Sequence, residues 1–301
     1  MTAAPHPERR AAGLVLLAAC AFGSLSIGVT LATRAGVSLI ALMAWRYALA
    51  TPLLVIAAGG PARLRIEPTR ALALLLLGGG QTLITWLSFS SLEWLSAAQM
   101  GFLFYTYPAW VALMAAITGT ERLTPVRLGA LALALGGIGV MVGAPWSAAL
   151  PGAGVARAVG AAVIYAGYIP LLHRMRGPHS AAVASTFVIA GAAVVFTAWA
   201  ISQRVLFNGM SAAMWGIALL SAGVSTVVAF IAFLRGLEVL GPVRTAILST
   251  VEPFWTTILA ALLLGQAIGS ATLVGGAGII VAIALLQRSA HPAIPDAPPP
   301  E

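Results

Sequence analysis

One acidic side chain lies deep inside an apolar stretch of the sequence. Glu252 stands nine residues into the run Val243–Leu264, which is about 14 Å along a helix. A carboxylate at that depth is costly and usually has a functional role. Pro253 follows it and lacks an N–H group, so we expect the carbonyl of Ser249 to lose its helical partner. An acid beside a broken helix suits an ammonium group or a proton, and the alternative is an ion pair with Arg46 that only holds helices together.

A second proline predicts a similar break in the first half of the chain. Pro108 would free the carbonyl of Phe104, and Tyr107 stands at the place that Glu252 occupies in the second break. The two breaks therefore differ chemically, which fits a bound molecule with two different ends. Tyr105 adds a further ring beside this break. The alternative interpretation of Pro108 is a packing kink.

Further polar and aromatic side chains occur in the middle of apolar runs. They either line a central cavity or join helices, and they are Ser24, Gln81, Thr85, Trp86, Tyr165, Tyr168, Ser225 and Thr226. Tyr165 and Tyr168 are three residues apart and share a helix face. Arg46 could attract a carboxylate or pair with Glu252. The aromatic rings could supply apolar and cation–π surface.

These residues must be positioned by elements that cross a membrane. About 60% of the residues are hydrophobic and 8% are charged, against about 25% charged in soluble domains. Apolar runs of about 20 residues span a bilayer. Ten are found: Ala11–Thr33, Val37–Ala58, Ala71–Ser91, Ala97–Gly119, Leu123–Val142, Ala153–Leu172, Ala181–Ser202, Ala213–Leu234, Val243–Leu264 and Gly269–Leu286. The sequence thus predicts an all-α membrane protein with ten transmembrane helices.

The distribution of arginine predicts the orientation in the bilayer. All 16 cationic residues are arginine. With the N-terminus inside, the cytoplasmic set is Arg9, Arg10, Arg63, Arg65, Arg70, Arg122, Arg127, Arg174, Arg176, Arg235, Arg244 and Arg288, and the outer set is Arg34, Arg157 and Arg204. This bias follows the positive-inside rule and places both termini in the cytoplasm. The cations form no single basic face, so we expect the lipid bilayer and not nucleic acid as the partner.

The residue inventory argues against an enzyme. Without lysine, a Walker A loop and a Schiff base are impossible. The four histidines lie in the tails or at a cytoplasmic edge, so the histidine base that an intramembrane serine protease needs is missing from the apolar runs. Glycine groups such as 78–80 are interpreted as sites of close helix packing. Cys20 is the single cysteine, which excludes a disulfide within the chain. No cofactor and no metal site are expected.

The two halves of the chain resemble each other. Comparing Ser91–Leu123 with Gly236–Ile268, at a shift of 145 residues, gives eight identities in 33 positions. Each half holds five predicted helices, an odd number, so the second half must be inverted relative to the first. Inverted repeats around a central site are the architecture of secondary transporters that work by alternating access. A sensor or receptor that binds without flux is the alternative from another class.

Several short motifs resemble the drug/metabolite transporter superfamily with two EamA-type halves. They are Phe22-Gly23-Ser24, Arg46, Leu95-Ser96-Ala97-Ala98, Tyr107-Pro108, Thr120-Glu121-Arg122-Leu123, Leu240-Gly241-Pro242, Val251-Glu252-Pro253 and Leu264-Gly265-Gln266, where the family usually has Glu in place of Gln266. The predicted organisation is a cytoplasmic segment 1–10, five-helix halves 11–147 and 148–288, and a disordered cytoplasmic tail 289–301. The resemblance implies a multi-pass protein of the bacterial plasma membrane that exports metabolites.

We therefore expect a non-ATP transporter that moves a small molecule out of the cell. The resemblance and the acid together favour amino acids with hydrophobic or aromatic side chains. Another metabolite or a cationic drug is the alternative substrate. Protons are a candidate coupling partner of Glu252, and the oligomeric state is left open.

Overall fold

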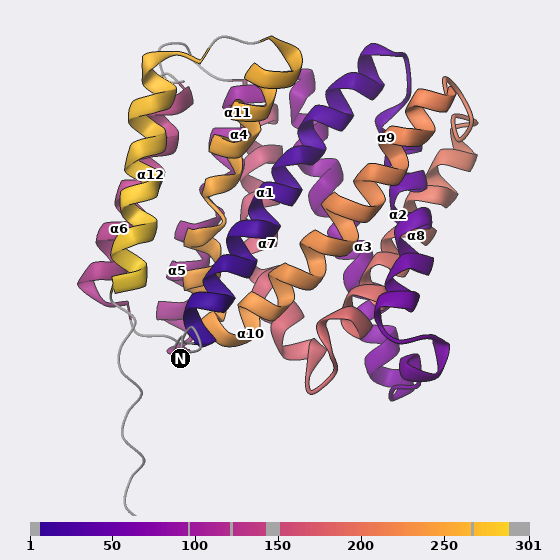
Figure 1. Cartoon of the computed structure of the whole chain (residues 1–301), viewed down its shortest axis with the longest axis horizontal. Coiled ribbons are helices and arrows are strands. Elements are labelled where there is room, and N and C mark those ends of the chain that lie inside the picture. The colour runs from indigo at the N-terminus through magenta and orange to yellow at the C-terminus, as the bar shows by residue number, and fades with distance from the viewer. Residues whose placement is uncertain (1–6, 96, 121–122, 143–150, 266–267, 289–301) are drawn as a thin grey trace, which may run out of the picture.

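The computed structural model describes residues 7–95, 97–120, 123–142, 151–265 and 268–288, and within these ranges the chain is a helical bundle without β-strands (Figure 1). The helices are α1 (Pro7–Arg34), α2 (Leu39–Ala57), α3 (Pro68–Ser90), α4 (Ala97–Phe104), α5 (Tyr107–Ile117), α6 (Pro125–Val142), α7 (Gly152–Arg176), α8 (Ala181–Ser202), α9 (Ala212–Ala222), α10 (Ala229–Leu248), α11 (Val251–Leu264) and α12 (Ser270–Arg288). Short 3-10 turns cover Pro61–Leu64 and Ser91–Glu93, and a π-helix, η4 (Gly223–Val228), joins α9 to α10. Figure 1 shows α1 beginning and α12 ending at one end, called here the N-terminal end of the bundle; the opposite end is called the far end.

Long apolar helices confirm a multi-pass membrane protein. Six segments are long and apolar enough to cross a bilayer: Pro7–Arg34, Leu39–Ala57, Pro68–Ser90, Gly152–Arg176, Ala181–Ser202 and Ala212–Leu248. Shorter apolar helices make up the rest of the bundle. The number of ten spans stays a prediction. The expected tail 289–301, most of the segment 1–10 and the motif residues Ser96, Glu121, Arg122 and Gln266 lie outside the described residues.

Two predicted spans are each divided into two helices. The run Ala97–Gly119 consists of α4 and α5, and the run Val243–Leu264 consists of the last turns of α10 followed by α11. The breaks fall within one residue of each other when the halves are compared at the 145-residue shift. Gly241, with φ of 74°, bends α10 ahead of the second break. The prolines thus interrupt both halves at equivalent places, as expected from their missing N–H groups.

The expected free carbonyl at the second break is a wrong prediction. The carbonyl of Ser249 accepts the N–H of Glu252 at 3.0 Å. The chain tightens into a turn with a three-residue hydrogen bond, so this carbonyl has a backbone partner although Pro253 cannot donate to it.

Glycine allows helices of the two halves to touch along their backbones. A Cβ added at Gly78 of α3 would collide with the carbonyl of Val188 in α8, and one added at Gly191 of α8 would collide with the carbonyl of Leu75. Small residues at a crossing permit this close approach in a membrane, where helix association depends on packing. The contact places α8 of the second half directly against α3 of the first.

Candidate functional site

The acid in the second break lies at the start of a helix. Glu252 is the second residue of α11 and belongs to its first turn, where the helix dipole favours negative charge. The phenols of Tyr105, Tyr107 and Tyr165 interact with it electrostatically. The Tyr105 side chain also comes close to its carboxylate. The two breaks are therefore joined directly, Tyr105 from the first meeting Glu252 from the second.

Five side chains continue from this acid into the bundle as an aromatic row: Phe104, Tyr105, Tyr107, Tyr165 and Tyr168. The rings of Tyr107 and Tyr165 meet edge to face, with centroids 4.8 Å apart. Phe104 stacks on Tyr165 at 5.6 Å, and Tyr165 stacks on Tyr168 at 6.2 Å. The Tyr107 hydroxyl donates to the carbonyl of Ala246 in α10 at 3.5 Å. The row thus combines apolar ring faces with hydroxyl groups, next to one carboxylate.

Helix α1 covers this acid through the Phe22-Gly23-Ser24 motif. A Cβ at Gly23 would lie 2.8 Å from the Thr256 hydroxyl and 2.9 Å from the carbonyl of Glu252. The Thr256 hydroxyl donates to the carbonyl of Gly23 at 3.1 Å, and Nε1 of Trp255 donates to Oγ of Ser24 at 3.1 Å. Ser24 therefore joins α1 to α11 and holds the helix that carries Glu252.

Arg46 is bound to the π-helix and not to Glu252. Its Nε donates to the Thr226 hydroxyl and its Nη2 to the carbonyl of Ser225, both at 2.8 Å. Its guanidinium also lies 4.6 Å from the centroid of the Tyr47 ring. In the described part of the chain, Arg46 and Glu252 are not within ion-pair distance, although the charge of Arg46 acts on Glu252. The expected ion pair between Arg46 and Glu252 is therefore not seen. The hydrogen-bond acceptors of Arg46 are Ser225 and Thr226 instead.

The comparisons with known proteins give the family. The sequence profile of the EamA-like transporter family matches residues 9–143 and again residues 152–288. The chain belongs to the EamA-like transporter family. Among curated proteins, none matches the sequence. One solved structure, titled only as the crystal structure of a protein, aligns with a TM-score of 0.77 at 20% identity, covering 92% of this chain and 96% of that one. This similarity shows a shared fold.

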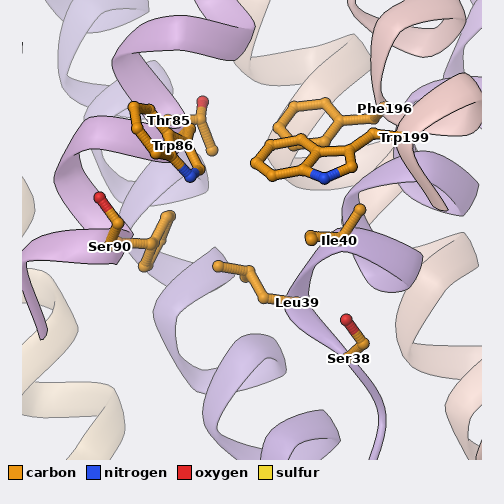
Figure 2. A pocket seen from close by; sticks show the side chains of 9 residues that line it. Ser38, Leu39, Ile40, Thr85, Trp86, Ser90, Phe196 and Trp199 are labelled. Atoms are coloured by element: carbon orange, nitrogen blue, oxygen red, sulfur yellow. The ribbon is translucent and has the colours of Figure 1, made fainter. Parts of the chain in front are cut away.

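In this EamA-like chain, Thr85 and Trp86 lie away from the acid. Both line a pocket of about 220 Å³ at the far end of the bundle, between α2, α3 and α8 (Figure 2). The helices that surround Glu252 contribute nothing to its lining. Gln81 lies one turn before Thr85, whose hydroxyl donates to the Gln81 carbonyl at 2.8 Å. The predicted cavity residues therefore do not all gather around Glu252: Thr85 and Trp86 line this pocket, and Ser225 and Thr226 bind Arg46.

Two features of the site, Tyr47 and the π-helix, were not predicted from the sequence. Tyr47 is fully buried, and its hydroxyl accepts from Arg46 at 3.3 Å; it also interacts electrostatically with Tyr165 and Tyr168. Its place beside Arg46 in the chain was the available signal. The π-helix around Ser225 had no signal, because its residues are ordinary for an apolar helix.

Proposed function

We propose that the chain is a secondary transporter that works by alternating access and exports amino acids with hydrophobic or aromatic side chains across the bacterial plasma membrane. The observation that carries the proposal is the position of Glu252 beside the aromatic row. A carboxylate can hold an ammonium group, and neighbouring rings can hold both the cation and an apolar side chain. The inverted repeat supports alternating access, and the direction rests on the family.

The composition of the site favours this substrate class over anions. Within the described residues around Glu252, the nearest cationic group, Arg46, is already occupied by Thr226 and Ser225. A dianionic phosphorylated sugar would have to lie beside an acid without a partner for its charge. An ammonium group meets the acid directly, and a cationic drug is the second candidate for the same reason.

Counterflow in proteoliposomes tests this proposal. Wild-type protein should exchange radiolabelled phenylalanine or leucine, and Glu252→Gln should slow this exchange about tenfold because the ion pair with the ammonium group is lost. Glu67→Gln is the matched control, since it removes an exposed acid that accepts a hydrogen bond from the exposed Thr69 hydroxyl. Normal exchange by Glu252→Gln would exclude the acid from binding. Transport of sugar phosphates without amino acids would exclude the substrate class.

Binding without flux is measured separately through Cys20. This side chain, the only cysteine, is half-buried and interacts electrostatically with Glu252. We expect phenylalanine to slow the reaction of Cys20 with N-ethylmaleimide in the wild type but not in Glu252→Gln. Protection in a protein that gives no counterflow would identify a receptor.

A further inference from the structure

The pocket at the far end has aromatic walls. Trp86 of α3 faces Phe196 and Trp199 of α8 across it, and Leu39 of α2 lies on a third side (Figure 2). Phe89 of α3 also lines the pocket. The indoles of Trp86 and Trp199 meet edge to face, with centroids 6.3 Å apart. Aromatic walls of this kind favour flat ring systems through edge and face contacts.

A positive charge lies next to two of the residues that line this pocket. The guanidinium of Arg157, at the start of α7, lies 5.5 Å from the ring centroid of Trp86 and 4.3 Å from that of Trp94. Its Nη1 reaches the carbonyl of Ser90, another lining residue, at 3.5 Å. Its ion pair with Glu93 spans 3.6 Å, and the Glu93 side chain is 64% exposed. Such a loose, exposed pair leaves the guanidinium open to competition by another anion.

The volume limits the size of the occupant. A cavity of about 150 Å³ holds one benzene ring, whereas drug-sized ligands occupy about 300–1,000 Å³. At about 220 Å³, this pocket accommodates one or two fused rings with a short substituent.

We infer that this pocket is a second binding site, specific for a planar aromatic ring that carries a carboxylate. The ring lies against Trp86, Phe196 and Trp199, and the carboxylate meets Arg157, which neighbours Trp86 and Ser90. The hydroxyl of Ser38, another lining residue, can accept or donate a further hydrogen bond.

This site is separate from Glu252 but adjoins the aromatic row. Phe196 stacks on Tyr47 at 5.6 Å, and Tyr47 interacts with Tyr165 and Tyr168. The inference does not require the chain to transport anything, because it rests on the pocket and on Arg157 alone.

Fluorine NMR with 5-fluoroindole-3-acetate in nanodiscs tests the inference. The probe has a ring and a carboxylate but no ammonium group, so the Glu252 site does not select for it. We expect saturable line broadening with wild-type protein and about tenfold weaker binding to Arg157→Gln, from loss of one charge-assisted contact. Arg9→Gln, with the same charge change at the N-terminal end of the bundle, should bind as the wild type does.

Two variants address the ring site. Leu39→Trp fills the pocket and should abolish saturable broadening, and Trp86→Leu, at a side chain that is 38% exposed and tolerant of change, should weaken it severalfold. Glu252→Gln should leave it unchanged. Equal broadening in empty nanodiscs or with folded Trp86→Leu would show partition into lipid and overturn the inference. Loss of binding in Glu252→Gln would overturn it by placing the probe at the acid.

Discussion

Glu93 and Glu238 occupy equivalent positions of the two repeats, and each pairs with an arginine of the same helix, α7. Glu93 meets Arg157 near the first turn of α7, and Glu238 meets Arg176 at its last residue. The second pair is the tighter one, with two contacts of 2.6 and 2.7 Å. Helix α7 is therefore held near both ends by equivalent glutamates of the two repeats. The contact is tight at the N-terminal end of the bundle and loose at the far end.

The difference between these pairs predicts a difference in stability. Arg176→Gln should lower the free energy of unfolding by about 1–2 kcal/mol, because a two-contact bond between a buried guanidinium and a half-exposed carboxylate is lost. Arg157→Gln should cost less than about 1 kcal/mol, since its partner is exposed. Thermal unfolding of the purified variants in detergent measures both. Equal losses would contradict the assigned asymmetry.

The backbone contact between α3 and α8 gives a second prediction. Gly78→Ala should destabilise the protein by about 1–3 kcal/mol, because the new methyl group meets backbone that cannot yield. Gly79→Ala is the matched control, because a Cβ there meets nothing within 4 Å; it should be neutral or stabilising by under about 1 kcal/mol. Melting temperatures of the two variants provide the comparison, and the prediction fails if Gly79→Ala is the more harmful one.

The fork of Arg46 gives a third prediction. Arg46→Lys should lower stability by about 1.5–3 kcal/mol, since an ammonium group cannot reproduce the planar fork that bonds both the Thr226 hydroxyl and the Ser225 carbonyl. Arg34→Lys, at the exposed end of α1, keeps the same charge and should change nothing. Unfolding of the two variants in detergent is the measurement, and an unchanged Arg46→Lys would show that charge alone is needed.

The partner of the acid gives a fourth prediction. Tyr105→Phe keeps the ring contacts with Phe104 and Tyr107, at 5.8 and 6.3 Å, but removes the hydroxyl that faces Glu252. We expect the Michaelis constant for exchanged phenylalanine to change severalfold while the melting temperature stays within a few degrees. Steady-state counterflow at several concentrations measures it. A large fall in melting temperature with an unchanged Michaelis constant would assign the hydroxyl to the fold.

The membrane class and the broken helices could be predicted from local sequence features. Apolar length and the positions of Pro108 and Pro253 are properties of single segments, so no tertiary information was needed. The meeting of Tyr105 with Glu252 was not predicted, although both residues were candidates, because it depends on how two segments about 145 residues apart pack together.

The roles of Arg46 and Trp86 show where the sequence was insufficient. Arg46 had a plausible acid partner, but a π-helix brought the Ser225 carbonyl and the Thr226 hydroxyl within its reach instead. Trp86 shared the periodicity of Gln81 and Thr85, so it was grouped with a central cavity. Its position near the end of α3 instead places it in the pocket with α8. Which neighbouring helix a side chain contacts depends on how the helices pack, and periodicity along one helix does not contain that information.

The glycine crossing of α3 and α8 has a counterpart where a Cβ at Gly137 of α6 would meet the carbonyl of Gly275 in α12. Each crossing joins a helix of residues 9–143 to one of residues 152–288. A movement that parted the halves as rigid blocks would have to open both backbone contacts at once. Groups of helices that could shift with the least loss of packing therefore contain helices from both halves. The boundary between the two sequence repeats is thus not the boundary between such groups.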